Sequence, residues 1–358
     1  MQKKLIALAV ASLAWAPFAA QAADVEIGGV MDLGVQMSET ETGGVTSKTK
    51  TAGIHNGAST SSFKVTVTED LGGGMKFKGY METDPALGTN TGADFANAPN
   101  WLQLSGNFGA VTLGFMNNYA LSASSASQPF GTGLASGYNG SWGRLDGAQV
   151  LGPVEARITG SNAGVGARDI RKNRTLQYEM PRMGGFSAGI IYGFKNDDAA
   201  AQSDAAIGQI QIGASFSAGP LNVALAHSTL EQQANFTGTT SNELTHTMIG
   251  ANYKLGSITI YGGYTMSEAS NKADVDSTSM NVAAMFQLNP QLGLGVNYVK
   301  VTDDTARVQD RDLIGFGLNY AMSKRTLAYV RYQSGDKLDA TANSGDYSDI
   351  AVGISHSF

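Results

Sequence analysis

The 358-residue chain contains no cysteine, so no disulfide bond stabilises its fold. Proline is scarce, with 8 residues, whereas glycine is abundant, with 45. Beyond residue 22 no apolar run approaches the roughly 18 residues that mark a membrane-spanning helix. The formal net charge of -6 argues against nucleic acid as a partner. These absences leave two classes, a soluble β-protein or a barrel whose lipid-facing residues are hidden by alternation.

The first 22 residues have the composition of a secretory signal peptide. Lys3 and Lys4 give a positive start, an apolar run covers residues 5–20, and Ala20-Gln21-Ala22 is a small-x-small cleavage motif. The run is too short for a membrane helix and a cleavage motif follows it. We therefore predict cleavage between Ala22 and Ala23, with residues 1–22 as signal peptide and residues 23–358 as one domain.

The segment after this leader alternates strictly between apolar and polar positions. In residues 25–37, VEIGGVMDLGVQM, the odd positions are apolar or glycine, while Glu26, Asp32 and Gln36 fall on even positions. A period of two predicts a β-strand with one apolar and one polar face. The length exceeds that of most globular strands and suffices for a tilted strand to cross a bilayer.

The same pattern recurs along the chain and predicts sixteen strands. Besides 25–37, the stripes lie in 63–67, 75–82, 101–105 (the weakest), 111–115, 175–180, 186–194, 210–216, 221–225, 249–253, 258–266, 280–288, 292–298, 314–320, 325–333 and 348–358. Short turns and long polar connections alternate from start to end. A transmembrane antiparallel β-barrel shows this arrangement, with the short turns periplasmic and the long loops extracellular, whereas a soluble sandwich mixes its loop lengths.

The last strand runs to the final residue, and closure of the barrel explains it. Strands in lipid cannot leave edge amides unpaired, so the first strand must pair with the segment that ends at Phe358. Phe358 is expected to point outward into an interfacial aromatic girdle. Tyr80 falls on the polar face, which makes it a lumen residue unless the local register differs.

Five stretches, in order over nearly the whole chain, resemble segments of the general diffusion porins of Gram-negative bacteria, especially the β-proteobacterial type. The stretches are TEDLGGGMK (68–76), LSGNFGAVTLG (104–114), PFGTGLA (129–135), NRTLQYEMPRMGGFSAGIIYG (173–193) and SKRTLAYVRY (323–332). The resemblance implies an integral outer-membrane barrel of sixteen strands, usually a homotrimer, in contact with lipid and lipopolysaccharide. It implies passive diffusion of ions and small hydrophilic solutes, with no enzymatic activity and no cofactor.

The resemblance also implies that the third extracellular loop, here about residues 117–172, folds inward to narrow the pore. PFGTGLA lies inside this loop, and VEARIT (154–159) is either an extra short strand or an insertion over the mouth. A surface loop without a role in the pore is the alternative.

The charges of the predicted constriction depart from the family pattern. Ser62, Ala98 or Pro99, and the pair Phe115 and Met116 stand where the family tends to carry arginine or polar residues. The candidate constriction residues are Lys64, Lys76, Lys78, Glu179 and Arg331 on the wall and Arg144, Arg157 and Arg168 on the loop. Because both sides then carry basic residues, we expect a weak preference for anions.

Other chemistry finds little support in the sequence. The four histidines, His55, His227, His246 and His356, have no ligand spacing, and the acidic segments 195–198 and 301–312 fit no calcium-loop motif. Two alternatives stay open. One is a substrate-specific channel of the same fold, and the other is an outer-membrane enzyme or adhesin, for which His246 is the catalytic candidate.

Overall fold

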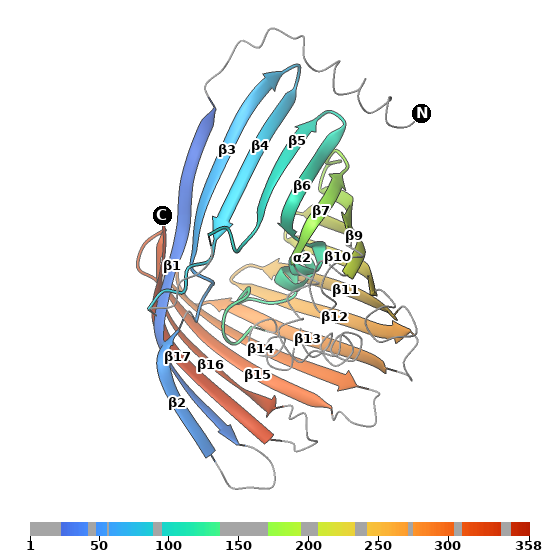
Figure 1. Ribbon diagram of the computed structural model, residues 1–358. Coiled ribbons are helices and arrows are strands. Elements are labelled where there is room, and N and C mark those ends of the chain that lie inside the picture. The colour runs from blue at the N-terminus through green and yellow to red at the C-terminus, as the bar shows by residue number, and fades with distance from the viewer. Residues whose placement is uncertain are drawn as a thin grey trace.

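A closed antiparallel β-barrel with one short helix accounts for the described residues of the computed structural model (Figure 1). The structure describes residues 23–41, 48–55, 57–88, 95–136, 171–194, 207–232, 242–270, 275–303, 310–337 and 345–358. The strands are β1 (Asp24–Glu41), β2 (Lys48–His55), β3 (Ser62–Gly72), β4 (Met75–Thr83), β5 (Asn100–Gly106), β6 (Gly109–Asn117), β7 (Arg171–Glu179), β8 (Phe186–Gly193), β9 (Ile207–Ala218), β10 (Leu221–Gln232), β11 (Asn242–Leu255), β12 (Ile258–Ser270), β13 (Val275–Gln287), β14 (Leu292–Asp303), β15 (Arg311–Ala321), β16 (Thr326–Lys337) and β17 (Gly345–Ser357). The helix is α2 (Tyr119–Ala126). In this part of the chain no helix is long and apolar enough to cross a membrane.

Seventeen described strands fill sixteen positions around the barrel, because β2 and β3 share one. β2 pairs with the second half of β1, residues 34–41, and β3 pairs with the first half, residues 24–30. The predicted sixteen-stranded barrel is therefore confirmed, including the weak strand at 101–105. β2 was not predicted, because Lys48 and Lys50 alternate there with threonines and leave no apolar stripe.

β17 closes the barrel on β1. Their register runs from Thr40 opposite Tyr347 to Val30 opposite Ser357. At the end of the chain the amide of Phe358 donates to the carbonyl of Gly29, and the amide of Gly29 donates to the carbonyl of Phe358, both at 3.2 Å. The Phe358 side chain is exposed, as predicted. These bonds extend the ladder between β1 and β17, so the backbone amides there are paired.

The barrel is apolar outside and polar inside, as the alternation predicts. On β1, Val25 is 62% exposed, whereas Asp32 is completely buried. On β9, Ile212 is 54% exposed and its neighbour Gln211 is completely buried. Such an apolar outer surface is stable where the surrounding solvent is lipid rather than water. On both strands, the residues predicted to face outward are exposed and those predicted to face inward are buried.

Short turns gather at one end of the barrel. Gly73 and Gly74 connect β3 to β4 with φ of 62° and 80°, a conformation that side chains other than glycine rarely adopt. Gly256 connects β11 to β12 in the same way, with φ of 60°. Most residues of the long connections lie outside the described part of the chain, and so do residues 154–159, for which an extra short strand or an insertion over the mouth was predicted.

Candidate functional site

Residues 118–136, here called the belt, follow β6 and lie on the inner face of the barrel. Helix α2, within the belt, packs on β10 and β11 (Figure 1). Its buried residues Ala120 and Ala123 contact Ala224, Ala226 and Met248, which are inward-facing wall residues. Small side chains on both sides allow this close approach. The described first part of the predicted third loop thus lies inside the barrel, while residues 137–170 lie outside the described residues and their inward fold stays a prediction.

Inward-facing glycines form the seat of the belt. A Cβ added to Gly250 would lie 1.9 Å from the carbonyl oxygen of Ala123, and one added to Gly213 would lie 2.0 Å from the ring of Tyr119. The same close approach to belt atoms, at 2.6 Å or less, occurs at Gly263, Gly295, Gly315 and Gly317. Five strands of the inner wall between β9 and β15 therefore present glycine where the belt passes, which lets the belt lie close to the wall.

Amides on the wall satisfy the polar groups of the belt. Asn118 donates from Nδ2 to Gln209 Oε1 at 3.2 Å, and the amide of Ala135 donates to Gln333 Oε1 at 2.9 Å. Asn281 donates from Nδ2 to the carbonyl oxygen of Ser127. These groups are buried, and buried polar groups without partners destabilise a fold. The glutamine and asparagine side chains thus fix the belt at both ends and near its centre.

Tyr119, at the start of the belt, contacts the barrel wall at β7. Its hydroxyl accepts a hydrogen bond from Gln177 Nε2 at 2.9 Å, and burial raises the pKa of this hydroxyl above its usual value. Tyr119 is therefore uncharged at neutral pH. Beside it lies a cavity of about 220 Å³ lined in part by Ser122, Glu179 and Arg182.

Arg331 lies beneath the belt. Its guanidinium carbon is 4.6 Å from the ring centroid of Phe130 and 5.4 Å from that of Tyr329. Nη1 donates to the carbonyl oxygens of Leu318 and Val330 at 3.0 and 3.1 Å. With only 3% of the residue exposed, this cation packs against the belt rather than facing the lumen.

Asp32 fastens a second inward segment, residues 57–61, between β2 and β3. One carboxylate oxygen accepts from the amides of Ala58 and Ser59, at 3.0 and 2.6 Å, and the other accepts from the hydroxyl of Tyr329 at 2.6 Å. The amide of Leu134 in turn donates to the carbonyl of Gly57 at 2.8 Å. The buried carboxylate of Asp32 therefore connects β1, β16 and the end of the belt.

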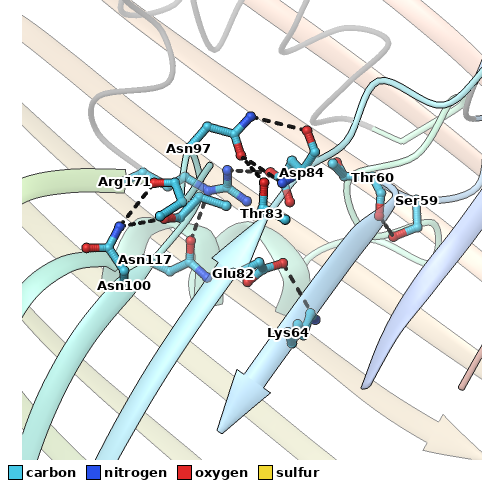
Figure 2. Close-up of polar contacts among 12 residues, drawn as sticks. Ser59, Thr60, Lys64, Glu82, Thr83, Asp84, Asn97, Asn100, Asn117 and Arg171 are labelled. Atoms are coloured by element: carbon cyan, nitrogen blue, oxygen red, sulfur yellow. Dashed lines mark hydrogen bonds and ion pairs between the residues drawn. The ribbon is translucent and has the colours of Figure 1, made fainter. Parts of the chain in front are cut away.

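The inner face of β3 to β6, here called the facing wall, keeps charged side chains. Lys64 Nζ lies 3.7 Å from Glu82 Oε1, and Tyr80 donates from its hydroxyl to Glu82 Oε2 at 2.5 Å (Figure 2 shows the Lys64–Glu82 contact). The Lys64 side chain is 38% exposed, whereas that of Glu82 is 9% exposed. Lysine therefore presents the more accessible charge of the pair.

A second polar group lies where β4 and β6 end and β7 begins. Arg171 Nη1 contacts Asp84 Oδ2 at 2.9 Å, and Arg171 Nε donates to Asn117 Oδ1 at 3.1 Å (Figure 2). Asn97 Oδ1 accepts from the amide of Asp84 at 2.8 Å and from the hydroxyl of Thr83 at 3.2 Å. These bonds fix the chain on both sides of the point where the belt begins.

Tyr80 and Trp101 stack on the facing wall. Their ring centroids are 5.1 Å apart and the planes differ by 15°. Lys78 Nζ lies 5.9 Å from the centroid of Trp101. Tyr80 is thus a lumen residue, and the predicted register of β4 is confirmed.

The predicted constriction residues separate into three groups. Lys64 and Lys78 lie on the facing wall, and Lys76 is exposed near the β3–β4 turn. Glu179 ends β7 beside Tyr119, and Arg331 lies beneath Phe130. The loop residues Arg144, Arg157 and Arg168 and the residue before the predicted cleavage point, Ala22, lie outside the described residues, while Ala23 precedes β1. Whether these side chains set the constriction stays a prediction.

Sequence reasoning missed Asp32, Tyr329 and Trp101. Asp32 and Tyr329 are 297 positions apart, so no local pattern connects them. A usable signal was the absence of charge in residues 118–136, which contain no Asp, Glu, Lys or Arg. A segment so neutral and so rich in alanine, serine and glycine is suited to close packing against a wall.

His227, His246 and His356 each contact a hydroxyl group. His246 is buried, with Nδ1 2.9 Å from Ser267 Oγ, and His356 Nδ1 lies 2.9 Å from Thr326 Oγ1. Within the described ranges no group of three or more His, Cys, Asp or Glu residues is arranged to hold a metal ion. The charged and aromatic groups of the facing wall are therefore the candidate contacts for solutes.

Comparison with known proteins gives consistent matches over the whole length. A family model described as Gram-negative porin matches residues 7–340. Outer membrane porin protein 32 of Delftia acidovorans is 27% identical, over 100% of both chains. Among solved structures, the anion-selective porin from Comamonas acidovorans is similar with a TM-score of 0.76 and 22% identity, covering 94% of this chain and 100% of that one. The trimer form of OmpT from Vibrio cholerae gives a TM-score of 0.63 and 15% identity, covering 94% and 100%.

Proposed function

Because this chain belongs to the Gram-negative porin family, it is an integral outer-membrane channel for passive diffusion, and we propose that its pore favours anions weakly. Family membership places it among channels rather than enzymes. The observation that carries the function is the closed sixteen-position barrel with polar residues inside and apolar residues outside. A barrel of this size leaves an aqueous lumen for ions and small hydrophilic solutes.

Charge on the facing wall supports the anion preference. Lys64 is more exposed than its partner Glu82, and Lys78 lies on the same strand face as Lys76. The belt, in contrast, contains no charged residue. A relative of similar fold is described as anion-selective, which agrees with this proposal. In the Lys64–Glu82 pair of the facing wall the more exposed charge is therefore positive.

Reconstitution in planar bilayers tests both the channel function and the anion preference. We expect stepwise conductance in KCl and a reversal potential of anion sign in a salt gradient. Absence of any conductance from folded protein contradicts the channel function. A reversal potential of cation sign overturns the anion preference and leaves the channel in place.

We also propose that the protein is a homotrimer, and the outer surface supports an interface on one side. Seven tyrosines point outward, all from β7 to β16, namely Tyr178, Tyr192, Tyr253, Tyr264, Tyr298, Tyr320 and Tyr332. Among the described residues, β1 to β6 and β17 present no outward tyrosine or tryptophan. These residue types mark membrane–water interfaces, so the face without them is suited to another copy of the chain and the other face to lipid and lipopolysaccharide.

Single cysteine labels test this assignment, because the chain has no cysteine of its own. Leu113 on β6 and Ile212 on β9 are both 54% exposed and both point outward. We expect a fluorophore at Leu113 to be shielded from brominated lipid and one at Ile212 to be quenched. Equal quenching contradicts the proposed interface.

The signal peptide is a further proposal. Cleavage between Ala22 and Ala23 would give a mature chain that begins one residue before β1, and this position supports the assignment. The mass of the protein purified from outer membranes tests it. A mass that includes residues 1–22 contradicts it.

A further inference from the structure

The aromatic pair on the facing wall needs an explanation of its own. Tyr80 and Trp101 are cross-strand partners on β4 and β5, and both point inward. Neither ring is fully buried, and neither is part of the belt contacts described above. Aromatic rings in a core or in lipid gain a favourable free energy of transfer out of water. Rings that face an aqueous lumen do not gain it. A solute that covers the two rings during passage would gain part of this transfer free energy.

The cross-strand neighbours of the Trp101 indole differ in size on its two sides. Tyr80 stacks on the side of β4. On the other side the cross-strand neighbour is Gly114 of β6, which has no side chain and has φ of 141°. Its own partner on β7 is Thr175, a small residue. The wall beside the indole is therefore free of bulky groups.

Lys78 supplies an adjacent positive charge. Its Nζ, 5.9 Å from the indole centroid, is near the roughly 6 Å limit of a cation–π contact. Within the described residues no carboxylate oxygen lies within 4.0 Å of it, whereas Lys64 on the neighbouring strand contacts Glu82. An unpaired ammonium group beside an accessible ring is complementary to a planar anion.

We propose that Trp101, Tyr80 and Lys78 form a lumen subsite for aromatic carboxylates, with benzoate as the simplest. The aromatic ring stacks on the indole beside Gly114, and the carboxylate contacts the Lys78 ammonium group. This proposal rests on the proposed function, since the solute reaches the subsite through the lumen. A sugar fits less well, because the nearest amide and hydroxyl, Gln103 and Thr112, bond to each other at 2.9 Å.

Current through single channels tests the subsite directly. We expect benzoate to reduce the KCl conductance saturably at about millimolar concentration, as one stacked ring and one exposed ion pair allow. Cyclohexanecarboxylate has the same charge without an aromatic ring, and benzyl alcohol has the ring without the charge. Both are expected to block more weakly. Equal block by cyclohexanecarboxylate overturns the stacking role.

Matched variants separate the residues. Trp101→Leu is expected to weaken benzoate block about tenfold, whereas Tyr261→Leu, which removes another inward-facing ring on β12, leaves it unchanged. Lys78→Gln is expected to weaken block a few-fold, whereas Lys76→Gln, two residues nearer the turn, has little effect. Unchanged block in both Trp101→Leu and Lys78→Gln overturns the proposal.

Indole fluorescence separates failure of the subsite from failure of the channel. Trp142→Phe leaves Trp101 as the sole tryptophan after residue 22. Benzoate is expected to change its fluorescence saturably in detergent, and Lys78→Gln is expected to raise the half-saturating concentration. Conductance without a benzoate effect in either measurement overturns the subsite alone. Saturable fluorescence without conductance overturns the channel and leaves the subsite.

Discussion

The inner wall of the barrel has two regions of opposite design. From β9 to β15 it presents glycines, alanines and amides, and the belt lies directly on it. From β3 to β6 it presents lysines, a glutamate and two aromatic rings. In the first region small residues allow close packing, and in the second the charged and aromatic side chains are the proposed contacts for solutes. The pore surface is therefore not a uniform polar lining but a packed half and a chemically active half.

The comparison also explains the different positions of the charges. Arg331 on β16 and Asp32 on β1 lie between the two regions, and each is almost fully buried and held by hydrogen bonds. Lys64 and Lys78 belong to the active half and retain exposure. A charge that anchors the belt and a charge that biases ion passage are thus distinguished by burial rather than by residue type.

Filling the packed half should have the largest effect. In Gly250→Val the new side chain collides with the backbone of Ala123, which overpacks the seat at a cost of about 1–3 kcal/mol and displaces the belt. We expect higher single-channel conductance and a larger exclusion size in liposome swelling. Gly262→Val is the control, because nothing lies within 3.9 Å of a Cβ there. Wild-type conductance in Gly250→Val would show that the belt does not restrict the pore.

Removing the charge of Asp32 should have the next largest effect. Asp32→Asn exchanges an acceptor of three hydrogen bonds for an amide, which costs about 1–3 kcal/mol of unfolding free energy. Urea unfolding in lipid vesicles measures it. Tyr329→Phe removes one of these bonds, together with the bond that the Gly57 amide donates to the same hydroxyl, but it leaves the buried carboxylate with two donors, so we expect a smaller loss. A larger loss in Tyr329→Phe than in Asp32→Asn would contradict the anchoring role of the carboxylate.

Selectivity should respond to the active half alone. Lys78→Glu is expected to shift the reversal potential towards cations, because its charge faces the lumen. Arg331→Met removes a positive charge beneath Phe130 and is expected to lower stability with little change in reversal potential. Salt-gradient measurements on both variants decide the matter. A greater shift in Arg331→Met would reverse the assignment of the two regions.

Breaking the ion pair on the facing wall should have the smallest effect. Partly exposed pairs contribute about 0.2–1 kcal/mol, so Glu82→Gln and Lys64→Gln should both fold normally. Their reversal potentials are expected to move in opposite directions, towards anions in Glu82→Gln and towards cations in Lys64→Gln. Movement in the same direction would mean that the pair does not face the permeating ions.

Several features of the fold could be read from single residues and their neighbours. The exposure of Val25 and the burial of Asp32 follow from a period of two, since neighbouring residues of a strand point to opposite faces. β2 was not predicted, because its lysines and threonines show no apolar stripe. Helix α2 was not predicted, because its eight residues of alanine, serine, leucine and tyrosine have no clear apolar face.

The candidate site was less accessible to such reasoning. Lys64 and Lys78 were placed on the lumen from their parity alone. The stacking of Tyr80 on Trp101 required the register between β4 and β5, and the burial of Arg331 required the path of the belt. Parity gives the face on which a side chain lies, but not what covers it.

The sequence by itself determined which residues face lipid, how many strands close the barrel and that the last strand pairs with the first, because each of these follows from local alternation and the need to pair backbone amides. The tertiary structure alone decided which inward residues form the seat of the belt and which remain open. Six glycines on five strands and a carboxylate 297 positions from its tyrosine partner act together only when the barrel brings them into contact.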